Sequence, residues 1–393
     1  MSRREPLDAI VVGAGVVGAA AALGLAREGA RVALVEAQEP AAWRAEAPDL
    51  RVYALAPDAR ALLAALGARA GIASARAHPY RRMRVWDAAG GGELDFDADA
   101  FGQPALGYIV EHGLVVDRLW QALAREPGVE RHCPDALEAL EQDDEGVDAT
   151  LASGRRVRAR LLFGADGAHS RVRALAGIDW RGESYRQRAL VAYVRCERSH
   201  QDTCWQRFLP TGPLALLPCG DGRCSIVWTL PEAEAARLLA ADEAAFGAEI
   251  TRAFDSRLGA IRLDSPRVAF PLRRRLADPM LLGRLALLGD AAHAVHPLAG
   301  QGVNLGLRDV ADLLDTCAAA TAAGQAFDSP PALQRWARRR FSENSVAAHA
   351  FEGINRIFSN QSPAATLLRG PMLGLAGRVP ILPRALWRRA AGV

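Results

Sequence analysis

The chain lacks lysine altogether, so all 48 of its cationic side chains are arginine. A lysine Schiff base, a lysine general base and a P-loop lysine are therefore excluded from its chemistry. The 45 aspartates and glutamates leave a net charge of only +3. So weak a charge gives no indication of a nucleic-acid partner.

Cysteine and long apolar runs are also scarce. The six cysteines form no C-x-x-C pair, which indicates reduced thiols in a cytoplasmic protein and neither a disulfide framework nor a zinc site. The apolar run 9–26 is interrupted by Gly13, Gly15 and Gly18. We therefore expect neither a signal peptide nor a membrane span there. A length of 393 residues is typical of two domains.

The first informative pattern is a strand, a glycine turn, a helix and a second strand that ends in an acid. Gly13-Ala-Gly15-Val-Val-Gly18 follows the apolar run 7–12, and Glu36 lies eighteen residues after Gly18. Such glycines allow a tight turn, the approach of a pyrophosphate and close helix–strand packing, while the acid meets a ribose hydroxyl. The pattern predicts a dinucleotide site, and the acid argues against a bound 2′-phosphate, so NADP is not its ligand.

Two further glycine turns carry an acid. Asp166, in Gly164-Ala-Asp-Gly-Ala-His-Ser170, follows the apolar run 157–163. Asp290 follows Gly289 and the apolar run 285–288, which we expect to be a buried strand. By itself, the turn at Asp166 could be a plain turn. Arg51 is either a solvated loop residue or a contact to a cofactor phosphate.

After Asp290 comes a loop rich in proline and glycine, and a helix is expected to open near Val303. The loop contains Pro297, Gly300 and Gly302. A helix N-terminus offers unpaired N–H groups and a partial positive charge, which suit an anion or an electron-rich ring. Residues 285–310 therefore predict a cofactor seat.

The middle of the chain changes character. Short β-rich runs at 189–196, 205–209, 214–217 and 224–229 predict an antiparallel sheet that serves as a platform for a substrate. We expect a helix over 231–260, a strand over 268–272 and helical structure over 332–360. From Gly353 onward there are six arginines and no acid. This tail either packs on its own protein or a dimer partner, or contacts an anionic membrane.

The three turns, in this order, resemble those of the class A flavoprotein monooxygenases, the group that includes p-hydroxybenzoate hydroxylase. A finer similarity is to the ubiquinone-biosynthesis hydroxylases within that group. It rests on the stretches 296–309, 107–111, 212–218 and 357–360. His112 departs from the family pattern, in which asparagine is more frequent after Glu111.

The resemblance implies FAD as cofactor, NADH or NADPH as reductant, O2 as co-substrate, and hydroxylation of an aromatic ring through a flavin hydroperoxide. Asp290 would hold the ribityl chain, Pro297 would line the face of the flavin ring, and backbone N–H groups near Gly302 and Asn304 would stabilise negative charge on the reduced ring. The expected catalytic residues are Pro297, Gly302 and Asn304. The expected cofactor-binding residues are Gly13, Gly15, Gly18, Glu36, Arg51, Asp166, Gly289, Asp290, Gly300, Gln301, Gly302, Val303 and Asn304.

The fold implied is α/β: a Rossmann-like FAD-binding domain of the glutathione-reductase type, an inserted, mainly antiparallel substrate domain and a C-terminal helical region. We expect the FAD-binding domain to comprise 1–75, 105–180 and 270–340. The substrate domain would comprise 76–104 and 181–269, and the helical region 341–393.

The expected substrate is a polyprenyl phenol or benzoquinol of ubiquinone biosynthesis. The partners would be this hydrophobic aromatic molecule and a membrane surface or a multiprotein assembly, with the protein in the cytoplasm or peripheral at the inner membrane. Two alternatives stay open: an aromatic hydroxylase of secondary metabolism and a non-catalytic prenyl-binding protein. Asp290, His293 and His296 also imitate a metal cluster, but we expect no metal. His296 is a candidate base on the substrate side or a structural residue of the loop.

Overall fold

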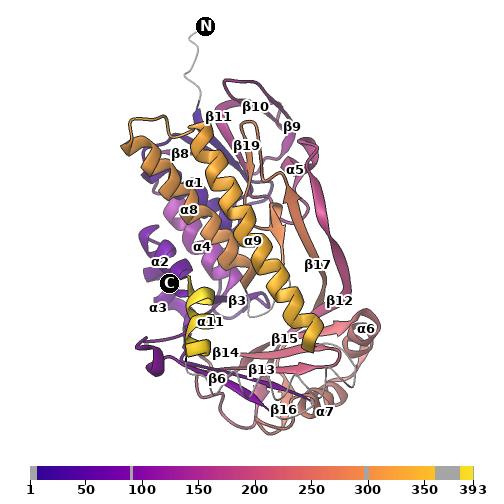
Figure 1. Ribbon diagram of the computed structural model, residues 1–393. Coiled ribbons are helices and arrows are strands. Elements are labelled where there is room, and N and C mark those ends of the chain that lie inside the picture. The colour runs from indigo at the N-terminus through magenta and orange to yellow at the C-terminus, as the bar shows by residue number, and fades with distance from the viewer. Residues whose placement is uncertain (1–6, 89–91, 296–300, 359–380, 393) are drawn as a thin grey trace.

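The computed structural model describes the chain except for residues 1–6, 89–91, 296–300, 359–380 and 393 (Figure 1). Three sheets and the helices that cover them make up the described residues. Within them, every helix is too short or too polar to span a lipid bilayer.

An eight-stranded sheet carries the first glycine turn. Its strands are β18 (Leu281–Leu282), β19 (Leu285–Leu287), β11 (Arg156–Gly164), β1 (Leu7–Val12), β2 (Val32–Val35) and β8 (Val129–His132), in that order, with β9 (Leu137–Gln142) and β10 (Val147–Leu151) added through β11. Pairing is parallel from β19 through to β8. Strands buried on both faces read as continuous apolar runs, as 7–12 and 285–288 do. The strand predicted over 285–288 is thus confirmed as β19.

A nine-stranded, mainly antiparallel sheet forms the second layer. The order is β20 (His293–Ala294), β17 (Val268–Asp278), β12 (Asp179–Cys196), β15 (Cys224–Pro231), β14 (Gly212–Pro218), β13 (Thr203–Leu209), β5 (Arg82–Asp87) and β6 (Glu93–Asp97), with β16 (Ile261–Leu263) paired to β12. Only β13 and β5 run parallel. The four predicted β-rich runs are confirmed as β12 to β15. A small sheet of β3 (Val52–Leu55), β7 (Gly107–Glu111) and β4 (His78–Tyr80) joins the two layers.

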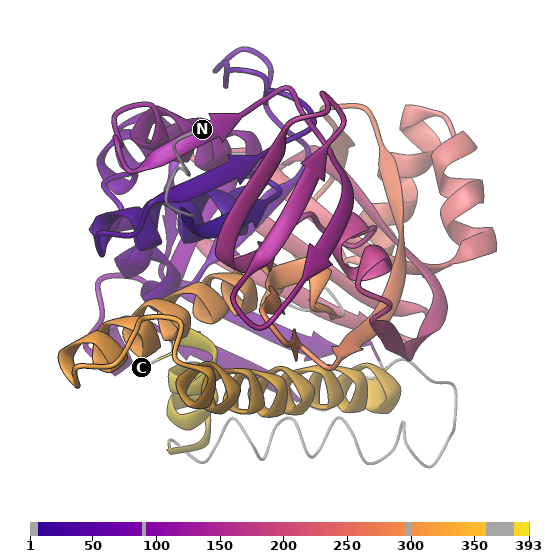
Figure 2. The same cartoon turned by 90° about the horizontal axis from the view of Figure 1, so that it is seen from above.

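Helices cover the outer surfaces of both large sheets. They are α1 (Val16–Arg27), α2 (Pro57–Ala65), α3 (Arg69–Arg76), η1 (Asp99–Phe101), α4 (His112–Leu123), α5 (Arg171–Leu175), α6 (Glu232–Ala240), α7 (Glu243–Ala253), η2 (Gly289–Ala291), α8 (Gln301–Ala322), α9 (Pro330–Phe358) and α11 (Ile381–Ala391). Helix α1 packs against α4 and α8, and its residues 18–25 are buried. Figure 2 shows α8 and α9 side by side along one edge of the molecule.

Three predicted elements differ from the structure. The single helix expected over 231–260 is wrong, because the chain turns at Ala241 and Asp242 caps a separate helix through Ala245 N–H (2.7 Å). The strand expected to end at Leu272 continues to Asp278, because its second half pairs with the start of β12. Helix α8 opens at Gln301, before Val303.

The predicted domain limits are crossed by two long strands. β12 begins at Asp179 and β17 ends at Asp278, so each extends past a predicted limit, at 180 and 270. Both strands belong entirely to the nine-stranded sheet. The division into three domains stays a prediction.

A single buried carboxylate ties the third glycine turn to the long helices. Asp309 on α8 accepts hydrogen bonds from Gly289 N–H (3.0 Å) and His293 Nε2 (2.6 Å) through Oδ2. Its Oδ1 accepts from Arg340 Nε (2.9 Å) and Asn344 Nδ2 (3.1 Å) on α9. Burial alone would raise the pKa of Asp309, but His293, Arg340 and Asn344 outweigh it and lower the pKa to about 2.

We expect Asp309→Asn to lower the free energy of unfolding by roughly 2–3 kcal/mol, because an amide cannot accept all four hydrogen bonds and Arg340 keeps only Glu343 as an anionic partner. Denaturant unfolding at neutral pH measures this. The matched control is Asp312→Asn, one turn further along α8, where the carboxylate pairs with the half-exposed Arg339. That change should cost no more than about 1 kcal/mol.

The pH dependence has a definite sign. A carboxylate with a lowered pKa stabilises the fold fully above its ordinary value of 3.8 and loses that contribution as the pH falls toward about 2. The stability difference between wild type and Asp309→Asn should therefore shrink below about pH 4. Equal effects of Asp309→Asn and Asp312→Asn at every pH would contradict this account.

Candidate functional site

The three glycines of the first turn have different surroundings: two are tightly packed and one faces open space. Gly13 has a φ of +94°, and a Cβ there would lie 2.6 Å from the Ala165 carbonyl oxygen. A Cβ on Gly18 would lie 1.8 Å from the Gly13 carbonyl oxygen. A Cβ on Gly15, at the N-cap of α1, would meet nothing within 4 Å. Gly13 and Gly18 therefore close the turn, and Gly15 leaves room at a helix N-terminus.

Glu36 lies directly beside this turn. Its Oε2 accepts a hydrogen bond from Ala14 N–H (2.6 Å), which places the carboxylate at the mouth of the turn. Trp120 on α4 donates from Nε1 to the Ala14 carbonyl (2.9 Å) and holds the turn from the other side. Trp120 was not singled out from the sequence, because no local pattern brings α4 to this turn.

Asp166 stabilises the second turn through one of its two carboxylate oxygens. Its Oδ2 accepts from Arg171 N–H (2.6 Å) and Val172 N–H (3.0 Å) at the start of α5. Its Oδ1 is buried and has no hydrogen-bond partner among the described residues. A buried acceptor of this kind needs a donor, which a ligand can supply.

The third turn brings Asp290 and Arg51 together at the surface. Gly289 adopts a φ of +56°, and Asp290 follows it within η2. Arg51 Nη2 lies 3.9 Å from Asp290 Oδ2, and both side chains are about half exposed. A Cβ on Gly302 would meet nothing within 4 Å, so the first turn of α8 is also open to a ligand.

Asn304 is placed differently from the open residues around it. Its side chain is fully buried, with Oδ1 accepting from Ala56 N–H (3.0 Å) and Nδ2 donating to the Ala54 carbonyl (2.9 Å). The side chain thus fixes the start of α8 against β3 and α2. The cofactor role expected near Asn304 therefore depends on backbone N–H groups.

The loop before β3 is organised by Glu111. Its buried carboxylate accepts from Trp43 Nε1 (3.0 Å) and Asp49 N–H (3.0 Å) and pairs with Arg76 Nη1 (3.0 Å). The sequence showed Glu111 only as part of a family motif. The loop that it holds delivers Arg51 to the third turn.

His112, where the family pattern favours asparagine, is bonded to Tyr53. Its Nδ1 lies 2.8 Å from the Tyr53 hydroxyl. Burial and the neighbouring Arg51 guanidinium lower the pKa of His112 to about 4, so the ring is neutral near pH 7. Burial also raises the pKa of Tyr53, which keeps its proton.

A cavity of about 500 Å³ joins the second and third turns to the nine-stranded sheet. Arg51, His169, Asp290, Gly302 and Val303 line one side of it. The other side consists mostly of apolar side chains from β12, β14, β15 and β17: Ala189, Val191, Pro213, Ala215, Leu217, Val227, Phe270 and Leu272. The anionic part of a ligand and an apolar ring can therefore occupy one continuous space.

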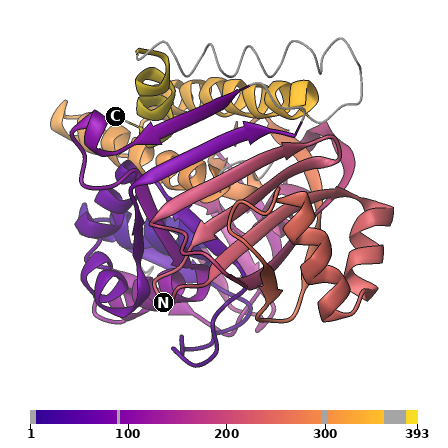
Figure 3. The ribbon, with the colours of Figure 1, turned by 90° about the horizontal axis from the view of Figure 1, so that it is seen from below.

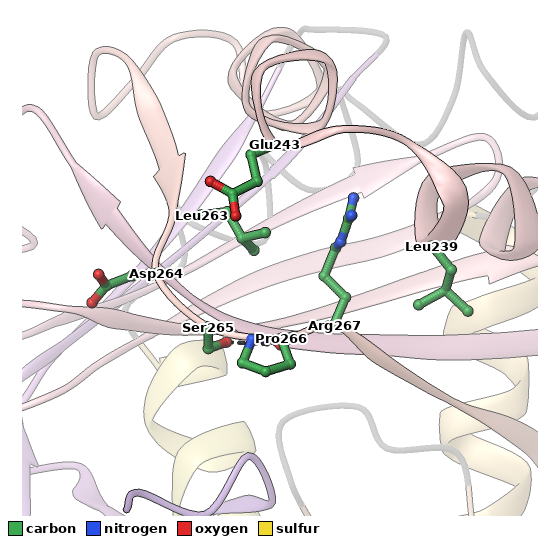
Figure 4. Close-up of a pocket in the computed structure, with 7 residues that line it drawn as sticks. All are labelled: Leu239, Glu243, Leu263, Asp264, Ser265, Pro266 and Arg267. Atoms are coloured by element: carbon green, nitrogen blue, oxygen red, sulfur yellow. Dashed lines mark hydrogen bonds between the residues drawn. The ribbon is translucent and has the colours of Figure 1, made fainter. Parts of the chain in front are cut away.

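A second hollow, of about 450 Å³, is shown in Figure 4. None of its lining residues, among those described, comes from the glycine turns. Arg267, at its edge, already donates to the Leu238 and Ala241 carbonyls. We assign no role to this hollow.

Several predicted residues lie outside the described part of the chain. They are Pro297, Gly300 and His296, and the side chain of Gln301 is not described either. His293 Nε2 is bonded to Asp309. Among the described residues, the one cluster with metal-ligand spacing is His78, His200 and Asp202. There His200 Nδ1 already accepts from Asp202 N–H (3.1 Å).

The arrangement fits a flavin dinucleotide. Gly15 leaves the N-terminus of α1 open beside Glu36, where a pyrophosphate and a ribose would lie. Asp290 and the open first turn of α8 face the cavity, where a hydroxylated chain and an electron-rich ring would lie. The free Oδ1 of Asp166 offers a further acceptor.

Comparison with known proteins also indicates an FAD-binding protein. Residues 6–336 match the FAD binding domain family. The chain is 40% identical over 392 residues to 3-demethoxyubiquinol 3-hydroxylase of Escherichia coli (strain K12), covering 99% of each. It is 38% identical to ubiquinone hydroxylase UbiL of Rhodospirillum rubrum, covering 98% of this chain and 89% of that one. Among solved structures, p-nitrophenol 4-monooxygenase PnpA from Pseudomonas putida DLL-E4 shares the fold, with a TM-score of 0.80, 22% identity and 99% of each chain covered.

In the first turn, the packed Gly18 and the open Gly15 should respond differently to replacement by alanine. Gly18→Ala forces a Cβ onto the Gly13 carbonyl and should abolish folding or lower the melting temperature strongly. Gly15→Ala should fold normally but raise the dissociation constant for FAD at least about tenfold, or roughly 1.4 kcal/mol. Thermal melting and flavin titration measure both. Equal FAD affinity in Gly15→Ala and wild type would show that the pyrophosphate lies elsewhere.

Asp290→Ala should yield folded protein with little flavin, because the weak, exposed pair with Arg51 contributes little to stability. The absorbance of purified protein gives flavin per chain. Asp99→Ala, which removes another exposed ion pair, is the control and should retain flavin. A full flavin complement in Asp290→Ala would eliminate the proposed ribityl contact.

Proposed function

Because this chain belongs to the FAD-dependent monooxygenases, the family that includes the ubiquinone-biosynthesis hydroxylases, we propose that it hydroxylates the ring of a prenylated hydroquinone or phenol. One atom of O2 enters a ring C–H bond to give a hydroxyl group. The other atom leaves as water, and NADH or NADPH supplies the two electrons.

The observation that carries this proposal is the continuity of the cavity. One wall consists of the residues expected to hold the flavin, and the facing wall is a predominantly apolar sheet surface. Sites of this kind hold a hydrophobic ligand through shape and a few polar contacts. The 40% identical relative is named for a quinol, and a quinol ring is both hydrophobic and electron-rich enough to be oxygenated.

When FAD is bound, it accepts electrons from the nicotinamide and activates O2. We assign the remaining tasks to the chain. Gly15 and Glu36 hold the ADP half, Asp290 holds the ribityl chain, and backbone N–H groups at Gly302 and Asn304 stabilise negative charge on the reduced ring. Pro297, which lies outside the described residues, stays the residue expected to line the face of that ring. The apolar wall keeps water from the reacting atoms.

The prenyl chain of the substrate would leave the cavity past Phe270. This side chain lines the cavity and is 48% exposed, so it bridges the interior and the surface. Val268, two residues earlier on the same face of β17, is also exposed. An apolar exit suits delivery of the substrate from a membrane surface or from a partner protein in an assembly.

The C-terminal helix combines two features that the sequence left as alternatives. Trp387 of α11 stacks on Phe101 (5.1 Å between ring centroids), so the helix packs on its own protein. Leu386, beside it, is exposed on a helix that also carries Arg384, Arg388 and Arg389. We propose that this outer face contributes to contact with an anionic membrane surface.

The test is turnover of purified holoenzyme with NAD(P)H, O2 and a prenylated quinol that lacks one ring oxygen. The product should carry one oxygen atom from 18O-labelled O2. Phe270→Ser should raise KM for the prenylated quinol about five- to tenfold by removing roughly 1–1.4 kcal/mol of apolar contact. It should leave KM for the same ring without a prenyl chain unchanged.

Leu282→Ser provides the control, since it changes an exposed apolar residue of β18 that does not line the cavity. It should change neither KM. NAD(P)H oxidation that yields only hydrogen peroxide with every quinol and phenol offered would overturn the proposed function.

A further inference from the structure

The two faces of the nine-stranded sheet differ in kind. Leu190, Leu216 and Ile226 point to one face and pack against Phe246 and Ile250 of α7. Helices α6 and α7 pack on that face, and Figure 3 shows them toward one side of the sheet, seen from below. Because side chains alternate along a strand, their sequence neighbours point to the opposite face and form the floor of the cavity.

The floor is not uniformly apolar. Gln206 on β13 and Ser225 and Thr229 on β15 line the cavity, and their exposed fractions are only 6%, 2% and 1%. Within the described part of the chain, these three side chains make no hydrogen bond to another protein group. Polar groups inside proteins are nearly always paired with protein, water or a ligand, so these three groups are available to a ligand that enters the cavity.

Gln206 lies at one end of a row of residues that crosses the floor. It pairs in register with Ala215 on β14, which pairs with Val227 on β15, which in turn pairs with Val191 on β12. These four residues form one row across the floor, and Gln206 is its polar member. Ser225 and Thr229 each lie two residues from Val227 on the same strand, one on either side of that row.

An amide suits an oxygenated ring in particular. It offers both a donor and an acceptor, so it can bond a phenolic hydroxyl or a methoxy oxygen. The hydroxyls of Ser225 and Thr229 could serve further oxygens of the same ring. A ring with an oxygen substituent can satisfy the amide of Gln206, whereas a plain hydrocarbon ring cannot.

We propose that Gln206 hydrogen-bonds an oxygen substituent of the substrate ring and thereby determines which ring carbon faces the flavin. The inference rests on the proposed function and adds the residue that sets the position of hydroxylation. Loss of this bond leaves the ring free to rotate on an apolar floor. The reducing equivalents are then lost as hydrogen peroxide, or a different carbon is hydroxylated.

The experiment compares Gln206→Met with wild-type holoenzyme, because methionine has nearly the same length and no comparable hydrogen-bonding group. With a prenylated quinol lacking one ring oxygen, KM should rise about three- to tenfold. The fraction of NAD(P)H oxidation coupled to product should fall, with peroxide or a positional isomer making up the difference. Gln121→Met, the same change at an exposed residue of α4, should match wild type.

Flavin content and melting temperature establish that Gln206→Met is folded, and Gln206→Leu provides a second variant if it is not. Wild-type KM, coupling and product position in a folded variant would overturn the role of Gln206 and leave the proposed function standing. Failure of the wild-type enzyme to hydroxylate any quinol or phenol would overturn both.

Discussion

The structure depends most on the buried carboxylate of Asp309. It joins the turn at Gly289, the strand at His293 and the long helix α9 through four hydrogen bonds to one side chain. An ionised group so deeply buried is tolerated only because charged and amide donors surround it. The same contacts fix the third glycine turn relative to α8, so the expected seat of the flavin and the packing of the helices share one anchor.

The two large sheets contribute different parts of the expected site. The parallel sheet ends in turns whose backbone groups and acids are expected to bind the dinucleotide, and the antiparallel sheet presents a largely apolar floor. Successive side chains of its strands point alternately to this floor and to the opposite face, which packs against α6 and α7. Small side chains such as Ala189 and Ala215 leave the cavity between the layers open. The polar side chains that line the cavity from this sheet are Gln206, Ser225, Thr229, Arg273 and Arg275, and they limit how a ring can lie.

The elements that could be predicted from the sequence are those whose pattern lies within one short stretch of the chain. Gly13 to Gly18 with Glu36, the strand before Gly289, and the four β-rich runs are each contained in one stretch with its own periodicity and turn residues. The single helix predicted over 231–260 was wrong because Asp242, a helix cap, was hidden in an alanine- and glutamate-rich run. Arg340, Trp120 and Gln206 could not be found, since their roles arise from contacts between distant segments. The assignments of Pro297 and Gly300 stay predictions, because these residues lie outside the described part of the chain.

The central claim is that this chain adds one oxygen atom to the ring of a ubiquinone precursor. Mass spectrometry of quinones and their precursors, in cells lacking the gene and carrying no other hydroxylase of this family, tests it most directly. The account predicts loss of mature ubiquinone and accumulation of a prenylated precursor that lacks one ring oxygen, and the missing oxygen identifies the carbon. An unchanged quinone pool in those cells would contradict the account.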